Sequence, residues 1–160
     1  MPAIDIQNDL EYPIQPARLQ DAAALVISHH GSDGSLSIVI TDDETIAALN
    51  QQYRGIDAPT DVLSFPADEP PVEMVEEAAY LGDLLIAFPY TSAQAAREGH
   101  PLSDSLALLV VHGTLHLLGY DHDSAENRAR MWAAQDNALR ALGISLDIVP
   151  ALESYSDHES

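Results

Sequence analysis

Three histidines lie close together in the stretch VVHGTLHLLGYDHD, which spans residues 110–123. His112 and His116 are four residues apart, so on a helix both imidazoles project from one face, about 6 Å from each other. Gly119 can take the left-handed backbone conformation that ends a helix, and the turn would bring His122 round to the other two. Three neutral imidazoles leave the fourth position of a tetrahedral zinc site open to water, as in catalytic sites. The spacing therefore predicts a catalytic metal centre.

Two other interpretations of this stretch have to be weighed. The histidines could be ordinary hydrogen-bonded residues of a buried helix, which suits one histidine better than three at this spacing among leucines 115, 117 and 118. The spacing H-x-x-x-H-x-x-G-x-x-H is also that of the metzincin proteases, which carry a glutamate as general base directly after the first histidine. Here that position is Gly113, so the carboxylate of the peptidase mechanism is missing and peptide hydrolysis is the weaker inference.

Length and composition indicate one domain. A chain of 160 residues, 46% of them hydrophobic, can build one core but not two comfortable ones. We expect a single metal-dependent hydrolase domain over residues 1–146 and an acidic, frayed tail over residues 147–160. There is no apolar run of about 18 residues and no secretory signal, so we expect a cytoplasmic protein with no membrane contact. Because the chain has no cysteine, a metal must rest on histidines and carboxylates.

The charge balance is unusual for a protein that would bind a polyanion. There are 26 acidic residues against six arginines and no lysine, which gives a formal net charge of −20. Such a surface repels nucleic acid at long range. We favour a solvated acidic surface of salt-adapted or biased composition over a surface selected for a basic partner. If the protein binds nucleic acid, the few arginines near the site must contact it, helped by the cation.

Strands and helices alternate along the chain. Apolar and β-branched runs predict four strands, at residues 3–6, 36–40, 60–65 and 81–88. Helical periodicity predicts five helices, over residues 18–30, 41–54, 91–98, 101–118 and 123–142. Three helix starts are expected at capping residues, namely Thr41 with Glu44, Thr91, and Asp123 with Glu126. The prolines and acids of residues 66–79 predict a surface loop.

This order of elements predicts an α+β fold, of the α/β/α-like sandwich type. We expect one sheet of about four strands flanked by helices. The metal-binding helix should lie against the sheet as the most buried helix, since it is the most apolar.

Arg54 is a further candidate for chemistry. It lies at the end of the second predicted helix, just before a loop, where its guanidinium could hold a phosphate or stabilise charge in a transition state. From the sequence alone, a role in capping its helix or pairing with Asp57 is equally good.

Three aspartates also need an explanation. Asp61 and Asp83 lie near the starts of apolar strands, where an unpaired carboxylate is costly, so we expect each to accept hydrogen bonds from loop backbone. The alternative is that one of them supports a ligand histidine. Asp121 is a third candidate for that support, or for the missing base.

The other histidines, and two large apolar residues of the last helix, are predicted to have structural roles. We expect surface or capping positions for His29, His30, His100 and His158, and core positions for Met131 and Trp132.

Together these residues resemble a known family. The run from His112 to His122 resembles the signature of the YbeY family, bacterial rRNA maturation factors that act as single-strand-specific, metal-dependent endoribonucleases. Two further blocks match in the same order, Leu49-Asn50 through Tyr53-Arg54 to Phe65 and then Leu81-Gly82-Asp83. The resemblance thus covers roughly residues 49–122.

The resemblance implies both a site and a fold. It implies a sheet flanked by helices, with one zinc ion held by His112, His116 and His122, although three imidazoles also accept nickel or iron. It implies that Arg54 is the functionally important arginine of the family. The group that receives the proton stays open among Asp121, a nearby carboxylate and the 2′-hydroxyl of the substrate.

The resemblance also implies a biological setting. The expected substrate is single-stranded RNA, the expected process is 16S rRNA 3′-end maturation and ribosome quality control, and the expected partners are the small ribosomal subunit and its proteins. DNA is not expected. Family members that act on RNA should present a basic groove, and this chain has little basic charge to build one. The alternatives from other classes are a metzincin-like metallopeptidase and a non-catalytic, zinc-containing ribosome-assembly protein whose acidic face meets basic proteins.

Overall fold

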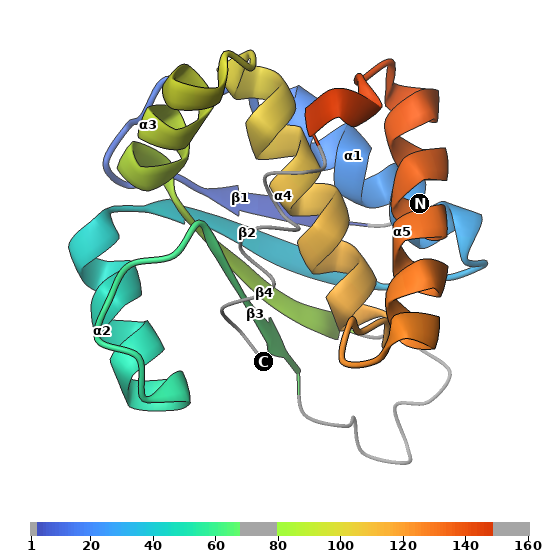
Figure 1. Cartoon of the computed structure of the whole chain (residues 1–160), viewed down its shortest axis with the longest axis horizontal. Helices are drawn as coiled ribbons and strands as arrows, with labels where there is room; N and C mark the ends of the chain where they lie inside the picture. Colours follow the sequence, from blue (N-terminus) through green and yellow to red (C-terminus); the bar gives the residue numbers. More distant parts are fainter. Residues whose placement is uncertain (1–2, 68–79, 149–160) are drawn as a thin grey trace.

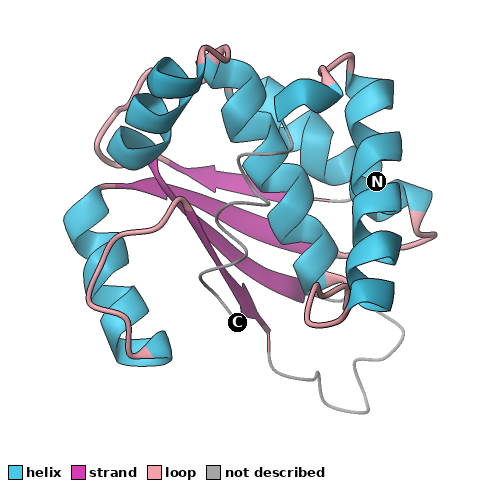
Figure 2. Cartoon of the chain, in the orientation of Figure 1, coloured by secondary structure: helices cyan, strands magenta, loops and turns pink. Residues whose placement is uncertain are grey.

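A computed structural model describes residues 3–67 and 80–148, and these residues form one sheet covered by helices (Figure 1). The strands lie in the order β1 (Ile4–Gln7), β2 (Ser35–Thr41), β4 (Tyr80–Ala87) and β3 (Val62–Pro66). The β1, β2 and β4 strands are parallel, and β3 is antiparallel to β4. Figure 2 shows the sheet as a single twisted layer.

The helices lie on both faces of this sheet. They are α1 (Pro16–His29), α2 (Asp43–Arg54), α3 (Phe88–Glu98), α4 (Leu102–Leu117) and α5 (Ala125–Leu142). The α4 helix packs against β3 and β4 with α1 and α5 beside it, and α2 contacts β3, β4 and α3. The predicted α+β class, with one four-stranded sheet flanked by helices, is confirmed.

The alternation of side chains along β4 separates the two faces. Leu84 lies on the face covered by α4, because a Cβ built on Gly113 of α4 would come within 2.7 Å of the Leu84 Cδ2 atom. Leu85 points the other way and packs with Leu63 around Ile46 of α2. The α2 helix therefore lies on the opposite face of the sheet from α4.

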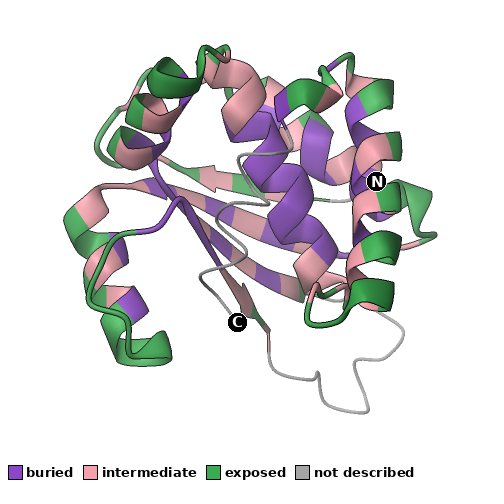
Figure 3. Ribbon diagram, viewed as in Figure 1, coloured by how far each residue is buried: buried purple, intermediate pink, exposed green. Residues whose placement is uncertain are grey.

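The α4 helix is the most buried helix, as its composition predicts (Figure 3). Every residue from Leu106 to Leu115 is buried. Such continuous burial needs a close approach to the sheet, and Gly113 provides it by leaving room for Leu84 and for the Ser64 hydroxyl. The glycine that replaces the metzincin glutamate thus faces the packed sheet.

Two helix starts differ by one residue from the predicted capping boxes. The α2 helix is capped by Asp42, whose carboxylate accepts a hydrogen bond from the Thr45 N–H at 2.7 Å, because Thr41 is still part of β2. The α5 helix is capped by Ser124, whose hydroxyl accepts from the Asn127 N–H at 3.1 Å. In both places a neighbouring residue with an equally suitable side chain takes the capping position.

The start of α3 also differs from the prediction. The helix begins at Phe88, with Pro89 in its first turn, where a missing N–H is not needed. Thr91 is buried inside the helix, and its hydroxyl donates to the Ala87 carbonyl at 2.8 Å rather than capping an N–H.

The packed part of the chain extends slightly beyond the predicted end at residue 146. Leu146–Ile148 forms a short 3-10 helix, and Ile148 is buried in the main core. The rest of the predicted tail, and residues 68–79 of the predicted loop, lie outside the described residues. In the part of the chain that the structure describes, no helix is both long and apolar enough to cross a membrane.

Candidate metal centre

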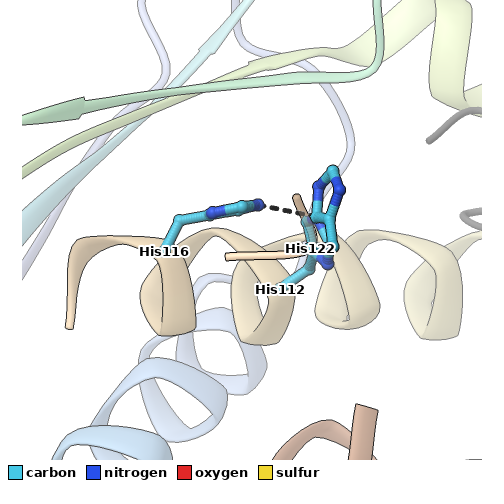
Figure 4. A group of neighbouring side chains, drawn as sticks. All are labelled: His112, His116 and His122. Atoms are coloured by element: carbon cyan, nitrogen blue, oxygen red, sulfur yellow. Dashed lines mark hydrogen bonds between the residues drawn. The ribbon is translucent and has the colours of Figure 1, made fainter. Parts of the chain in front are cut away.

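The three predicted ligands come together (Figure 4). Each of His112, His116 and His122 offers one ring nitrogen, and the three nitrogens lie within 4.8 Å of one another. The Nε2 atoms of His112 and His116 are 3.2 Å apart, and the His122 ring lies 5.7 Å and 5.1 Å from those two rings, centroid to centroid. The spacing in the sequence thus identified a real cluster.

The turn after α4 brings His122 to the other two histidines. Gly119 has a φ of +105°, a conformation that side chains resist, as the sequence predicts for this position. The next residue, Tyr120, folds back so that its N–H donates to the Leu115 carbonyl at 3.0 Å. The turn therefore fixes both the return of the chain and the position of the Tyr120 carbonyl.

The hydrogen bonds of two rings determine which nitrogens carry protons. The Nδ1 atom of His116 donates to the Tyr120 carbonyl oxygen at 3.0 Å, and the Nδ1 atom of His112 donates to the Gln135 side-chain oxygen, also at 3.0 Å. Carbonyl oxygens only accept, so in the neutral rings both Nε2 atoms present lone pairs. Two lone pairs face each other across 3.2 Å.

This donor set fits a metal ion. Lone pairs that face each other repel, whereas a shared cation turns the same arrangement into an attraction. In a tetrahedral zinc site with bonds of 2.0–2.1 Å, two nitrogens are separated by about 3.3 Å. The pair formed by His112 and His116 already has nearly this separation.

The electrostatics of His112 suit a ligand. The pKa of His112 is lowered to about 3, mainly by burial and also by the neighbouring His116 and His122, while the hydrogen bond with Gln135 acts in the opposite direction. His112 therefore remains neutral at physiological pH, as an imidazole must be to bind a metal.

Gln135 is a site residue that the sequence did not reveal. It lies on α5, is fully buried with 0% exposure, and holds the Nδ1 proton of His112. In the sequence it is one polar member of an amphipathic stripe, 23 residues after His112. The one sign of its role is that a polar side chain occupies the buried face of a helix.

Trp132, also on α5, lies against the cluster. It packs on the main core, as predicted, and in addition its ring meets those of His112 and His122 edge to face at 5.8 Å each. The guanidinium carbon of Arg128 lies 5.1 Å from the centroid of the Trp132 ring. The α5 helix thus forms one wall of the site.

The aspartates of the strands do not support His112 or His116. Asp61 is 2% exposed and accepts a hydrogen bond from the Val62 backbone N–H at 2.8 Å, as predicted for a carboxylate at a strand start. Asp83 accepts from the Tyr80 hydroxyl and alternates with Leu84, so it points to the face away from α4. The suggestion that Asp83 supports a ligand histidine is wrong, because the register of β4 directs its side chain to the other face.

The two candidates for catalysis are placed differently. Asp121 is exposed beside His122 and accepts the His122 backbone N–H at 2.8 Å. Arg54 is exposed at the end of α2, on the far face of the sheet from α4, and is not part of the histidine cluster. The left-handed Gly55, not Arg54, closes that helix through backbone hydrogen bonds.

The remaining histidines lie outside the cluster, as predicted. His29 is exposed, and the ring of His100 lies 4.0 Å from the Glu98 carboxylate. His30 is exposed and ends α1, but its Nε2 atom also accepts a hydrogen bond from the Tyr120 hydroxyl at 2.9 Å, a contact that its sequence position does not suggest. His158 lies outside the described residues.

Fold and site together define an α+β protein in which a buried helix and the turn after it assemble a group of three histidines that could hold a metal ion. The model of one family, Endoribonuclease YbeY, matches residues 5–143. The chain therefore belongs to the YbeY endoribonuclease family.

Several relatives are similar over most of their length. Endoribonuclease YbeY of Halorhodospira halophila is 44% identical over 127 residues, which cover 79% of this chain and 82% of that protein. Endoribonuclease YbeY of a Roseiflexus species is 51% identical over 114 residues, covering 69% of this chain and 71% of that protein. Among solved structures, TM1509 from Thermotoga maritima matches with a TM-score of 0.59 at 24% identity, over 100% of this chain and 97% of that one, which supports the fold.

Proposed function

We propose that this protein is a zinc-dependent endoribonuclease that cleaves single-stranded RNA in the cytoplasm. The proposed process is 16S rRNA 3′-end maturation and ribosome quality control, with the small ribosomal subunit and its proteins as partners. Membership of the YbeY family and relatives named Endoribonuclease YbeY support the activity. The observation that carries it is the pair of Nε2 lone pairs of His112 and His116, which face each other across 3.2 Å.

The metal would be held by His112, His116 and His122. A bound zinc ion would supply Lewis-acid polarisation of a phosphate oxygen and activation of a water molecule. Nickel and iron are compatible with the same three imidazoles, so the choice of zinc requires metal analysis.

The protein supplies the orientation of the ligands. The Tyr120 carbonyl and the Gln135 amide each accept an Nδ1 proton, which fixes the tautomers of His116 and His112 and the direction of their Nε2 lone pairs. His116 and His122 are each partly exposed, while His112 is buried. The partial exposure of two of the three residues supports a site that binds a substrate rather than a sealed structural site.

We assign two further roles to residues outside the ligand set. Arg54 would reach round the edge strand β3, which both α2 and α4 contact, and stabilise negative charge on the phosphoryl group through its planar set of donors. Asp121, the neighbour of His122, would receive the proton of the attacking group. A nearby carboxylate is the alternative acceptor. If the 2′-hydroxyl of the substrate is the attacking group in place of water, the same acceptor takes the proton of that hydroxyl.

The chemistry of the product end separates these routes. Attack by the adjacent 2′-hydroxyl breaks the bond to the 5′-oxygen and leaves a cyclic phosphate on the 3′ side. A 3′-hydroxyl on the upstream fragment excludes that route and requires water as the nucleophile. Mapping both ends of the cleaved RNA therefore tests whether water or the 2′-hydroxyl is the attacking group.

The central experiment combines metal analysis with an assay of cleavage. We expect purified protein to carry about one metal ion per chain and to cleave single-stranded RNA, with cleavage lost on chelation and restored by zinc. Cleavage that persists without metal would refute the proposal. Chelator-sensitive cleavage of an unstructured protein, with RNA left intact, would favour the peptidase alternative, against which Gly113 already argues because a side chain there would meet Leu84.

A further inference from the structure

An RNA-cleaving protein with a net charge of −20 must concentrate its few cations where the substrate lies. All six arginines of the chain fall within the described residues. Arg18 pairs with Asp104, and Arg130 pairs with Glu126 at 3.1 Å one helical turn away.

Arg128, which also has a further interaction within the protein, lies one side chain away from the three-histidine group. Its guanidinium carbon lies 5.1 Å from the centroid of the Trp132 ring, one turn further along α5. The Trp132 ring in turn meets the rings of His112 and His122 at 5.8 Å each. The indole of Trp132 thus lies in contact with the guanidinium of Arg128 and with two of the imidazoles, on the side of the site that α5 forms.

The other arginines lie on different parts of the fold. Arg97 is exposed in the last turn of α3, and Arg54 ends α2 on the opposite face of the sheet. Arg140 is on α5 like Arg128 but lies in its last turn, about 18 Å further along the helix axis. Arg128 is thus the arginine that the described structure connects to the histidine cluster through one ring.

We propose that Arg128, held over the indole of Trp132, binds a phosphate group of single-stranded RNA that flanks the phosphate at the metal centre. This inference rests on the proposed function. A guanidinium binds phosphate through paired donors, and stacking on an aromatic ring holds its plane in place before the substrate arrives. Because Trp132 holds the Arg128 guanidinium at a fixed position relative to the histidines, the contact of Arg128 with one phosphate would determine which phosphate of the RNA lies at the metal.

The test is the salt dependence of RNA binding. A short, single-stranded 2′-O-methyl oligoribonucleotide, which the 2′-hydroxyl route cannot cleave, is titrated into zinc-loaded protein by fluorescence anisotropy between about 50 and 200 mM salt. Arg128→Gln is compared with the wild type and with Arg140→Gln. The control removes the same charge from the same helix at its distant end, so it reproduces any change in long-range attraction.

We expect Arg128→Gln to weaken binding about three- to tenfold, as for one lost charge-assisted contact. For this variant, the slope of log affinity against log salt concentration should decrease in magnitude by about 0.7, the value for one phosphate contact with a single strand. Arg140→Gln should change the affinity only through the change in long-range attraction and leave the slope unchanged, and both variants should keep wild-type metal content and melting temperature. Trp132→Leu should reduce the slope as Arg128→Gln does, whereas Trp132→Phe, which keeps an aromatic face, should retain it.

Two outcomes count against the inference and are distinguishable. If the wild type binds and cleaves RNA while Arg128→Gln matches Arg140→Gln in affinity and slope, the phosphate contact is refuted and the proposed function stands. If the wild type neither binds this oligonucleotide nor cleaves RNA, the proposed function fails, and the contact fails with it.

Discussion

The Nδ1 atom of His116 donates its proton to the backbone carbonyl of Tyr120, 3.0 Å away in the turn that follows α4. Because the acceptor belongs to the backbone, the orientation of His116 is set by the turn at Gly119 and not by another side chain. The turn that returns the chain to His122 therefore also aims the second ligand. The orientation of the His116 ring therefore depends on the backbone conformation of residues 119–120.

Replacing His116 with alanine should remove the metal and leave the protein folded. The side chain is half-buried at the end of α4, and its loss from the metal-free protein removes the hydrogen bond with the Tyr120 carbonyl, worth about 1 kcal/mol. We expect lost metal binding, lost RNA cleavage and an unchanged circular dichroism spectrum. His100→Ala, outside the cluster, is the control and should keep its metal. An unfolded His116→Ala protein would instead support the non-catalytic alternative with structural zinc.

Gln135 can be tested by exchanging its side-chain acceptor. In Gln135→Leu the buried Nδ1 proton of His112 loses its acceptor, so we expect metal affinity to fall about 10- to 100-fold. Gln135→Glu keeps an oxygen in the same place and should retain the affinity or raise it. Competition with a chelator of known affinity gives both values. Equal affinity in the Leu and Glu variants would show that the hydrogen bond does not support the ligand.

The metal-free protein should lose stability on acidification because of His112. An unperturbed histidine has a pKa of 6.5, whereas the pKa of His112 in the folded protein is about 3, mainly because the side chain is buried. Between these two pH values the unfolded chain binds the proton and the folded chain does not. Stability should therefore fall as pH drops through this window, by up to about 1.4 kcal/mol per pH unit from this residue. Urea unfolding at several pH values measures the slope. His112→Gln, which does not titrate, should show a smaller slope, and an equal slope would contradict the assignment.

Gly113 should resist even a small side chain. A Cβ atom there would lie 2.7 Å from Leu84 Cδ2 in a fully buried contact. The overpacking cost of about 1–3 kcal/mol should outweigh the gain of about 1 kcal/mol from the higher helix propensity of alanine. We expect Gly113→Ala to lower the free energy of unfolding by about 1 kcal/mol. Combining it with Leu84→Val should recover part of this loss, and strict additivity of the two changes would argue against the contact.

Arg54 can be tested without disturbing the site. Because it is exposed at the end of α2, Arg54→Ala should keep the metal and change the free energy of unfolding by less than about 0.5 kcal/mol. If Arg54 stabilises charge on the phosphoryl group, cleavage should fall about 100-fold or more. Arg54→Lys, which keeps the charge but not the planar donors, should recover only part of the activity. Full cleavage by Arg54→Ala would remove Arg54 from the mechanism.

The three-histidine cluster could be predicted because its geometry is local. His112, His116 and the turn at Gly119 lie on one helix and its end, so periodicity and a glycine are enough to bring His122 round. The burial of α4 was predictable for a related reason, since an apolar run of this length has to lie inside the protein.

The features that escaped prediction depend on docking between elements distant in the sequence. Gln135 supports His112 only because α5 packs beside α4, and local periodicity carries no information on that pairing. Asp83 was assigned to a strand start, but the register of β4 decides which face it occupies. Where several suitable caps are adjacent, as at Thr41 and Asp42, the end of the preceding strand selects between them.

The position of Gln135 has a consequence for the order of events during protein synthesis. A ribosome releases the imidazoles of α4 before it releases α5, which carries Gln135 23 residues after His112. Until α5 emerges and docks, the Nδ1 proton of His112 has no acceptor, and the side of the site that α5 forms is absent. The three-histidine group therefore reaches its complete form only after α5 has left the ribosome and docked beside α4.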